Sequence, residues 1–180
     1  MIILFGVVGS GKSEQARRLV DKLKCPYIST SDLLRENLTP QIEETMLAGR
    51  LISDNYILSL LEPALKSAGA GTQECILDGA PRTLAQADWL IDKIKSKEVM
   101  LTSIIHLRVT KEVVLQRLRQ RSRQDDKEEV IAQRLKDYEQ ITTPVLDHLR
   151  QAGFTVNEVD GKRTPEQIQN DIAKLLKLKP

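Results

Sequence analysis

The sequence predicts a single α/β domain, a three-layer sandwich whose central sheet has five parallel strands. Two observations predict it: short apolar runs alternate with longer amphipathic ones, and no linker, repeat or low-complexity tract divides the 180 residues. Strands that alternate with helices form a parallel sheet covered on both faces. A chain of this length suits one compact domain with a substantial core.

The elements follow from these runs in chain order. Strands are expected in the five apolar runs 1–6, 27–29, 74–79, 103–109 and 154–159. Helices are expected over about 13–24, 31–36, 41–48, 54–67, 83–97, 111–121, 126–140 and 165–179. Pro144 is expected to kink the helix that begins near residue 126, because proline lacks a backbone N–H and its ring clashes with the preceding turn.

The composition excludes several classes of protein. Lysine and arginine number 27 against 25 acidic residues, a net charge of +2, whereas proteins held to nucleic acid by charge are usually more basic. Cys25 and Cys75 are too few for a disulfide framework or a zinc site, and we expect both to be buried free thiols. With no run of 18 apolar residues and no signal-peptide pattern, a cytoplasmic protein without membrane contact is expected.

One short stretch concentrates positive charge. RLRQRSRQDD, residues 117–126, places Arg117, Arg119, Arg121 and Arg123 at every second position. Such a run is compatible with a nucleic-acid backbone, with a cluster of nucleotide phosphates or with a solvated helix face. The run by itself does not decide among the three.

A phosphate-binding motif follows the first strand. GVVGSGKS, residues 6–13, fits the P-loop pattern G-x-x-x-x-G-K-[ST] and lies between a predicted strand and a predicted helix. Glycines let the backbone curl so that N–H groups point at phosphate oxygens, and the helix N-terminus adds partial positive charge. Lys12 is expected to reach the outer phosphates and Ser13 to ligate magnesium. The motif indicates a nucleoside triphosphate.

ECILDG, residues 74–79, supplies a second half for such a site. In isolation, Asp78 before Gly79 is typical of a turn. Beside a P-loop, an aspartate at the carboxyl end of a buried strand faces magnesium. We therefore interpret Asp78 as a magnesium-facing residue, directly or through water.

Seven motifs in order resemble the adenylate kinases and their nucleoside monophosphate kinase relatives. They cover nearly the whole chain: GVVGSGKSEQ, YISTSDLLR, AGRLISD, ILDGAPRTLAQA, EVVLQRLRQR, RQDDKEEVIAQRL and VDGKR. The resemblance implies transfer of the terminal phosphoryl group of magnesium-ATP to a nucleoside monophosphate. It also implies an inserted helical segment, about residues 30–59, that binds the monophosphate (NMP).

The resemblance assigns residues to both nucleotides. For ATP it implies Gly9, Ser10, Gly11, Lys12, Ser13, Glu14, Arg117, Arg121 and Arg163, with Arg117 stacked on the adenine. For the acceptor it implies Thr30, Arg35, Arg50, Ile52, Gly79, Arg82, Gln86, Arg123 and Arg134. Gln86 would read adenine by hydrogen bonds, which favours AMP. The catalytic set would be Lys12, Arg82, Arg121, Arg123 and Arg134.

The resemblance also interprets the arginine run as a phosphate clamp. Arg117 and Arg121 lie four residues apart and share a helix face. Arg119 points elsewhere, matches no family contact and is interpreted as a solvated charge. His106 and His148 have no family counterpart, and we expect both to be structural, since an ionised acceptor phosphate needs no general base.

Three positions depart from the family pattern. The family reads Gly-Thr after the loop lysine, whereas Ser13-Glu14 stands here and places a carboxylate near the triphosphate. Ser31 replaces the glycine of S-T-G-D. Family members insert a lid between the second and third arginines, whereas only Ser122 separates Arg121 from Arg123. We therefore expect a lid reduced to about residues 121–123 over a working but open site.

The sequence thus predicts a monomeric adenylate kinase that uses Mg²⁺, ATP and AMP, with no zinc and no nucleic-acid partner. Two alternatives remain at this stage. One is a kinase for another monophosphate, UMP, CMP or GMP. The other is a nucleotide-binding regulatory module.

Overall fold

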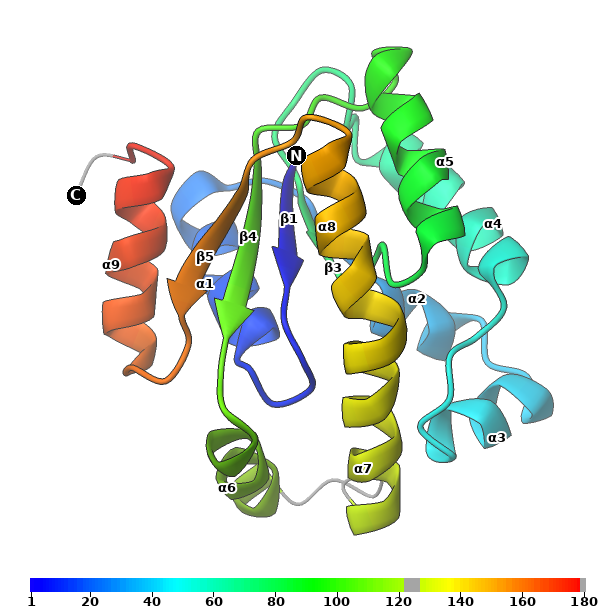
Figure 1. Ribbon diagram of the computed structural model, residues 1–180. Coiled ribbons are helices and arrows are strands. Elements are labelled where there is room, and N and C mark those ends of the chain that lie inside the picture. The colour runs from blue at the N-terminus through cyan, green and yellow to red at the C-terminus, as the bar shows by residue number, and fades with distance from the viewer. Residues whose placement is uncertain (122–126, 179–180) are drawn as a thin grey trace.

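A five-stranded parallel sheet forms the centre of the molecule (Figure 1). The computed structural model describes residues 1–121 and 127–178. Within them the strands are β1 Ile2–Phe5, β2 Tyr27–Ser29, β3 Ile76–Asp78, β4 Ser103–Arg108 and β5 Val156–Asp160, in the order β2-β3-β1-β4-β5. Each of the five predicted apolar runs forms one strand, and the predicted fold class is confirmed.

The helices also follow the predicted order. They are α1 Lys12–Leu23, α2 Thr30–Glu36, α3 Pro40–Leu47, α4 Asp54–Ser67, α5 Leu84–Lys95, α6 Lys111–Arg121, α7 Glu128–Asp137, a π-helical turn η1 Tyr138–Thr142, α8 Thr143–Gln151 and α9 Pro165–Leu175. Threonines start three of them: the hydroxyls of Thr39, Thr83 and Thr164 accept the backbone N–H three residues on. Such caps satisfy N–H groups that a helix start leaves without partners.

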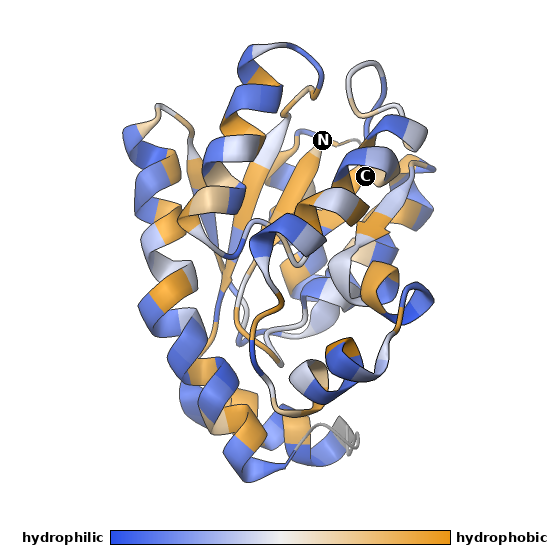
Figure 2. Cartoon of the chain, turned by 90° about the vertical axis from the view of Figure 1, so that its right-hand side faces the viewer, coloured by the Kyte–Doolittle hydropathy of each residue, from blue (hydrophilic) through white to orange (hydrophobic). Residues whose placement is uncertain are grey.

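Helices cover both faces of the sheet, which makes three layers. On one face, Ile3, Leu77 and Ile104 pack in a core with residues of α4, α5 and α8. On the other, Ile2 and Ile105 pack with residues of α1 and α9. Figure 2 shows apolar strands enclosed by helices whose outer surfaces are largely hydrophilic. Strands buried on both faces read as apolar runs, which is why the sequence pattern located them.

The strand register brings the carboxyl ends of the central strands together. Leu4 of β1 and Ser29 of β2 both pair with Asp78 of β3. The P-loop follows β1, and α6 and α7 extend beyond these strand ends (Figure 1). In open parallel sheets, ligands bind in the crevice at this end.

Just before Pro144, where the sequence predicts a kink, the structure has a π-helical turn in a helix that continues. Residues Tyr138–Thr142 form η1, and α8 then begins with Pro144 in its first turn. The Thr143 hydroxyl donates a hydrogen bond to the Tyr138 carbonyl over 3.0 Å. Proline is tolerated in the first turn of a helix, where no intrahelical N–H bond is needed. The wider turn therefore lets the chain pass proline while α7, η1 and α8 remain one continuous rod.

Two expectations about individual residues change. Cys75 is buried, as expected, but Cys25 is only partly buried because it lies in the turn between α1 and β2. Helix α7 begins at Glu128, two residues later than predicted. Among the described residues, no helix combines the length and the apolar character that a membrane crossing requires.

Candidate active site

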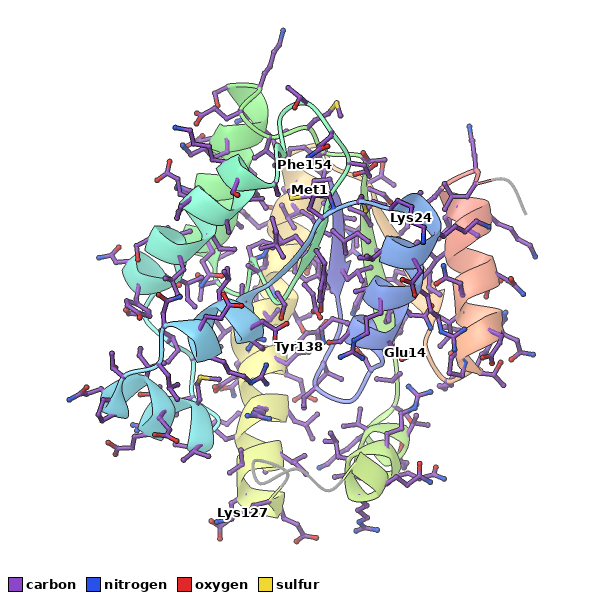
Figure 3. All side chains as sticks on the ribbon, turned by 180° about the vertical axis from the view of Figure 1, so that it is seen from behind. Met1, Glu14, Lys24, Lys127, Tyr138 and Phe154 are labelled. Carbon is purple, nitrogen blue, oxygen red and sulfur yellow. The ribbon has the colours of Figure 1, made fainter. Side chains whose placement is uncertain are left out.

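A cavity of about 460 Å³ opens at the carboxyl ends of the strands. Its walls come from the P-loop, from α2 and the segment before α4, from the loop after β3, and from α6, α7 and η1. Figure 3 shows Glu14 on α1 and Tyr138 on η1, both beyond the lower end of the sheet. The cavity falls in the range typical of small-molecule sites.

The P-loop curls around the side chain of its own lysine. The Lys12 ammonium donates to the carbonyl of Gly6 over 2.5 Å and to that of Val7 over 3.0 Å. Gly9 and Gly11 have positive φ values of 76° and 97°. A Cβ on Gly9 would lie 3.2 Å from the Leu118 side chain, a tight contact that adds to the strain of its positive φ. The loop therefore takes the shape of an anion-binding nest at the start of α1.

The predicted magnesium residues meet at the base of this loop. The Ser13 hydroxyl donates to Asp78 Oδ2 over 2.7 Å, and the Tyr27 hydroxyl donates to the same oxygen over 3.0 Å. Asp78 is buried, with 5% of its surface exposed. Burial and the nearby carboxylate raise the pKa of Tyr27 to about 12, so its hydroxyl remains a donor at neutral pH.

This donor set suits magnesium held jointly with a ligand. Within the described ranges, no cluster of three or more His, Cys, Asp or Glu side chains is placed to hold a metal. Magnesium is typically bound through one or two carboxylates, waters and substrate phosphates rather than by an all-protein cage. A hydroxyl and a carboxylate beside a phosphate-binding loop fit that mode.

Two arginines approach each other across the cavity. Arg82 Nε donates to the Gly79 carbonyl over 2.8 Å, and Arg134 Nη2 donates to the Met46 carbonyl over 3.4 Å. Desolvation by the surrounding protein and the positive charge of Arg134 lower the pKa of Arg82. Part of the Arg82 side chain is nevertheless exposed to solvent. The Asp78 carboxylate partly offsets the lowering of this pKa, and an anion bound beside both guanidinium groups would offset it further.

Other predicted acceptor residues surround the same end of the cavity. They are Thr30, Arg35, Arg50, Ile52, Gly79 and Gln86. Gly79 has φ 95°, and a Cβ there would lie 2.1 Å from the Thr30 hydroxyl, so β3 and α2 approach too closely for any larger residue. Arg35 pairs with Asp32 over 2.7 Å at the surface. Ser31, which replaces the family glycine, also lines the cavity.

The remaining predicted site residues, for both nucleotides, divide into three groups. Arg117 lines the cavity and donates to the carbonyls of Ser10 and Gly161 over 3.2 and 2.8 Å. Arg163 is not among the residues that line the cavity. Its side chain pairs with Asp171 over 2.8 Å, and its backbone carbonyl accepts a hydrogen bond from Arg117. The side chain of Arg121, all of Arg123 and the proposed lid at 121–123 lie outside the described part of the chain.

Glu14, the carboxylate that departs from the family pattern, has a cation beside it. Its Oε1 lies 2.8 Å from Arg18 Nε, one helical turn further along α1, and Arg18 Nη2 also contacts Glu166 of α9 over 3.0 Å. Glu14 lines the cavity. The ion pair reduces the repulsion that this carboxylate exerts on an anion at the loop.

Sequence reasoning missed several residues that complete the site. Tyr27 holds Asp78, the Thr142 hydroxyl donates to the Arg82 carbonyl over 3.1 Å, and Tyr138 lines the cavity. Asp54 contacts Gln86. Tyr27 and Asp54 stand inside motifs quoted for the resemblance, and that is the signal that was available. Nothing local to Tyr138 or Thr142 shows that η1 directs Tyr138 to His106 of β4 and Thr142 to the loop after β3.

His106 and Tyr138 connect the sheet to this helix. His106 Nε2 lies 2.9 Å from the Tyr138 hydroxyl, while its buried Nδ1 has no hydrogen-bond partner and lies 3.9 Å from Glu158. His148 of α8 pairs with Asp88 of α5 over 2.6 Å. Each of the two histidines therefore contacts a residue of another helix or turn. Arg119, interpreted from the sequence as a solvated charge, is exposed and lies 4.0 Å from Glu128.

The motif between β1 and α1, on a parallel sheet and beside a buried aspartate, defines a P-loop protein of the α/β kinase type. A family model described as adenylate kinase matches residues 4–154. The chain belongs to the adenylate kinase family.

Proteins named adenylate kinase match most of this chain. One from Mycobacterium sp. (strain MCS) is 40% identical over 164 residues, 88% of this chain and 90% of the relative. One from Corynebacterium urealyticum is 37% identical over 173 residues, 93% of each chain. One from Prochlorococcus marinus (strain MIT 9303) is 35% identical over 181 residues, 97% of each.

The buried histidine predicts how stability depends on pH. Desolvation lowers the pKa of His106 below its ordinary value of 6.5, so between pH 7 and 5 the folded protein protonates it less than the unfolded chain does. As pH falls from 7 to 5, the unfolded state binds more protons, and the free energy of unfolding should decrease. Urea unfolding at several pH values in this range measures that free energy, and its decrease should be smaller for His106→Gln than for the parent protein. If the free energy of unfolding falls equally with pH in the two proteins, His106 is not the cause.

Proposed function

We propose that the protein transfers the terminal phosphoryl group of magnesium-ATP to AMP, reversibly, giving two ADP. The observation that carries this proposal is the single cavity in which a P-loop and the pair Arg82 and Arg134 face the same space. One end suits a triphosphate and the other a monophosphate, as phosphoryl transfer between nucleotides requires. The names of the relatives support the same reaction.

At the donor end, the P-loop residues Gly9, Ser10, Gly11, Lys12 and Ser13 would hold the ATP phosphates. Arg117, which bridges the loop and Gly161, would cover the adenine. Arg121 and Arg163 remain assigned to ATP by the family pattern alone. Glu14 would take part through its ion pair with Arg18 rather than by touching phosphate.

At the acceptor end, the segment 30–59 would bind AMP against the loop after β3. Thr30, Arg35, Arg50, Ile52, Gly79, Arg82 and Gln86 line this part of the cavity, and Arg134 reaches it from α7. Arg82 and Arg134 would neutralise the acceptor phosphate and the moving phosphoryl group. Arg123 is assigned to the same task by the family pattern.

Ser13 and Asp78 would hold magnesium, directly or through water. When bound, the ion neutralises charge on the phosphate oxygens. The residues of the chain do the rest: Lys12 binds the outer phosphates, and the arginines stabilise charge that spreads over the transferring group. The AMP phosphate is already ionised, so no side chain needs to act as a base.

We also propose the localisation, oligomeric state and substrate class of the protein. We expect a cytoplasmic monomer that uses no zinc and acts on free nucleotides rather than nucleic acid. The near balance of charges, 27 basic against 25 acidic residues, supports the last of these.

Activity with different acceptors tests the proposal directly. With magnesium and ATP, ADP should form with AMP at a kcat/KM at least about tenfold above that for UMP, CMP or GMP, because a site that hydrogen-bonds one base leaves buried groups unpaired with another. A coupled assay of ADP formation measures this. Comparable rates with UMP would make the protein another monophosphate kinase, and nucleotide binding without transfer would make it a regulatory module.

Two arginines of the charged region should differ sharply. Arg134→Ala should reduce kcat about 100-fold or more, since a preorganised cation at the transferring group is lost. Arg119→Ala, at an exposed position 4.0 Å from Glu128, should change kcat by less than about twofold. Steady-state kinetics of both purified variants provides the measurement. Similar losses in the two would refute the assignment of Arg134.

The Glu14–Arg18 pair predicts a rescue. Arg18→Ala should raise KM for ATP by about two- to fivefold, because the Glu14 carboxylate would face the triphosphate without its cation. Glu14→Gln combined with Arg18→Ala should return KM to the parent value or below. The comparison is made with AMP saturating. If the double variant binds ATP as weakly as Arg18→Ala alone, repulsion by Glu14 is not the cause.

A further inference from the structure

The side-chain amide of Gln86 is held at both of its atoms. Its Oε1 accepts the backbone N–H of Arg82 over 2.8 Å, and its Nε2 donates to Asp54 Oδ1 over 2.8 Å. Asp54 Oδ1 also accepts the Thr83 hydroxyl over 2.8 Å. Asp54 is the first residue of α4 and Gln86 the third of α5. Gln86 is 4% exposed and lines the cavity.

These contacts determine which end of the amide is oxygen. A backbone N–H can only donate, and an ionised carboxylate can only accept. Rotating the amide by half a turn would place Nε2 against the Arg82 N–H and Oε1 against Asp54. Both hydrogen bonds would become repulsive contacts between like groups. Asp54 and the Arg82 backbone together therefore fix the orientation of Gln86.

A fixed amide has one donor and one acceptor left to offer. An amide nitrogen carries two hydrogens and an amide oxygen two lone pairs, and the contacts above use one of each. On adenine, the Watson–Crick edge presents a donor at N6 and an acceptor at N1. On guanine and hypoxanthine the order is reversed, with an acceptor at O6 and a donor at N1. The amide orientation that pairs with adenine therefore cannot pair with guanine or hypoxanthine.

We infer that Asp54 is a specificity-determining residue: by holding the Gln86 amide in one orientation, it makes the monophosphate pocket accept adenine and reject guanine and hypoxanthine. The inference rests on the proposed function and deepens it. Asp54 does not touch the base, so it is a positioning residue. Without it, only the Arg82 N–H would still oppose turning the amide, so guanine and hypoxanthine would be rejected less strongly. Shape alone separates adenine poorly from guanine and hypoxanthine, because all three share the same ring system.

The test is Asp54→Asn, which keeps the shape but can donate as well as accept. The kcat/KM for GMP and for IMP, each relative to AMP, should rise about tenfold, because turning the amide then costs only the hydrogen bond from the Arg82 N–H and no longer one to a charged acceptor. The matched control is Glu62→Gln, which removes another α4–α5 contact, the 2.6 Å pair with Lys93. It should leave these ratios unchanged.

Pyrimidines separate positioning from a general structural defect. Cytosine presents the same order of donor and acceptor as adenine, and uracil the same order as guanine. In Asp54→Asn, the UMP-to-AMP ratio should therefore rise, while the CMP-to-AMP ratio should stay within about twofold. An equal loss with every monophosphate, or no change in any ratio, would overturn the inference.

Binding measurements keep this inference distinct from the proposed function. Dissociation constants of the unmodified protein for AMP, purine riboside monophosphate and IMP, measured by calorimetry, should rise in that order. This result does not depend on transfer or on the folding of a variant. IMP binding as tight as AMP would refute the fixed amide. If AMP binds but no ADP forms, the proposed function fails, and the same dissociation constants measured for Asp54→Asn decide the inference about Asp54.

Discussion

The carboxylate of Asp78 is the point at which three parts of the molecule meet. It closes β3, accepts the hydroxyl of Ser13 from the P-loop and accepts that of Tyr27 from β2. It is 5% exposed, and burying a charge is costly unless it is hydrogen-bonded. The parallel register of β1, β2 and β3 brings these partners within reach. Asp78 therefore fixes the P-loop relative to β2 and β3.

The cations around Asp78 are oriented in a way that suits an anion. Arg82 and Arg117 donate to backbone carbonyls of Gly79, Ser10 and Gly161. A carbonyl fixes the direction of a guanidinium without cancelling its charge. By contrast, Arg18, Arg150 and Arg163 at the periphery contact carboxylates. Donors held in place before a ligand arrives need no reorganisation when charge develops, which is how such sites stabilise phosphoryl transfer.

The continuous rod of α7, η1 and α8 connects the acceptor side to the core. Val145 and Leu149 of α8 are buried against the sheet, whereas Arg134 of α7 reaches the cavity. Between them, η1 directs Tyr138 to His106 and Thr142 to the Arg82 carbonyl. The wide turn that accommodates Pro144 therefore also sets how the helix meets the site.

The sequence by itself determined the strands, the P-loop and the order of the motifs, because apolar runs and a glycine-rich phosphate loop are local features. It also pointed to Ser13 and Asp78 through the P-loop pattern, and to Arg82, Gln86 and Arg134 through the resemblance. Only the tertiary structure decided that Arg18 also contacts Glu166 of α9, that Thr142 holds Arg82, and that Asp54 fixes the amide of Gln86. Asp54 and Gln86 are 32 positions apart, and the direction of a side-chain amide depends on partners that only the packing of α4 against α5 brings together.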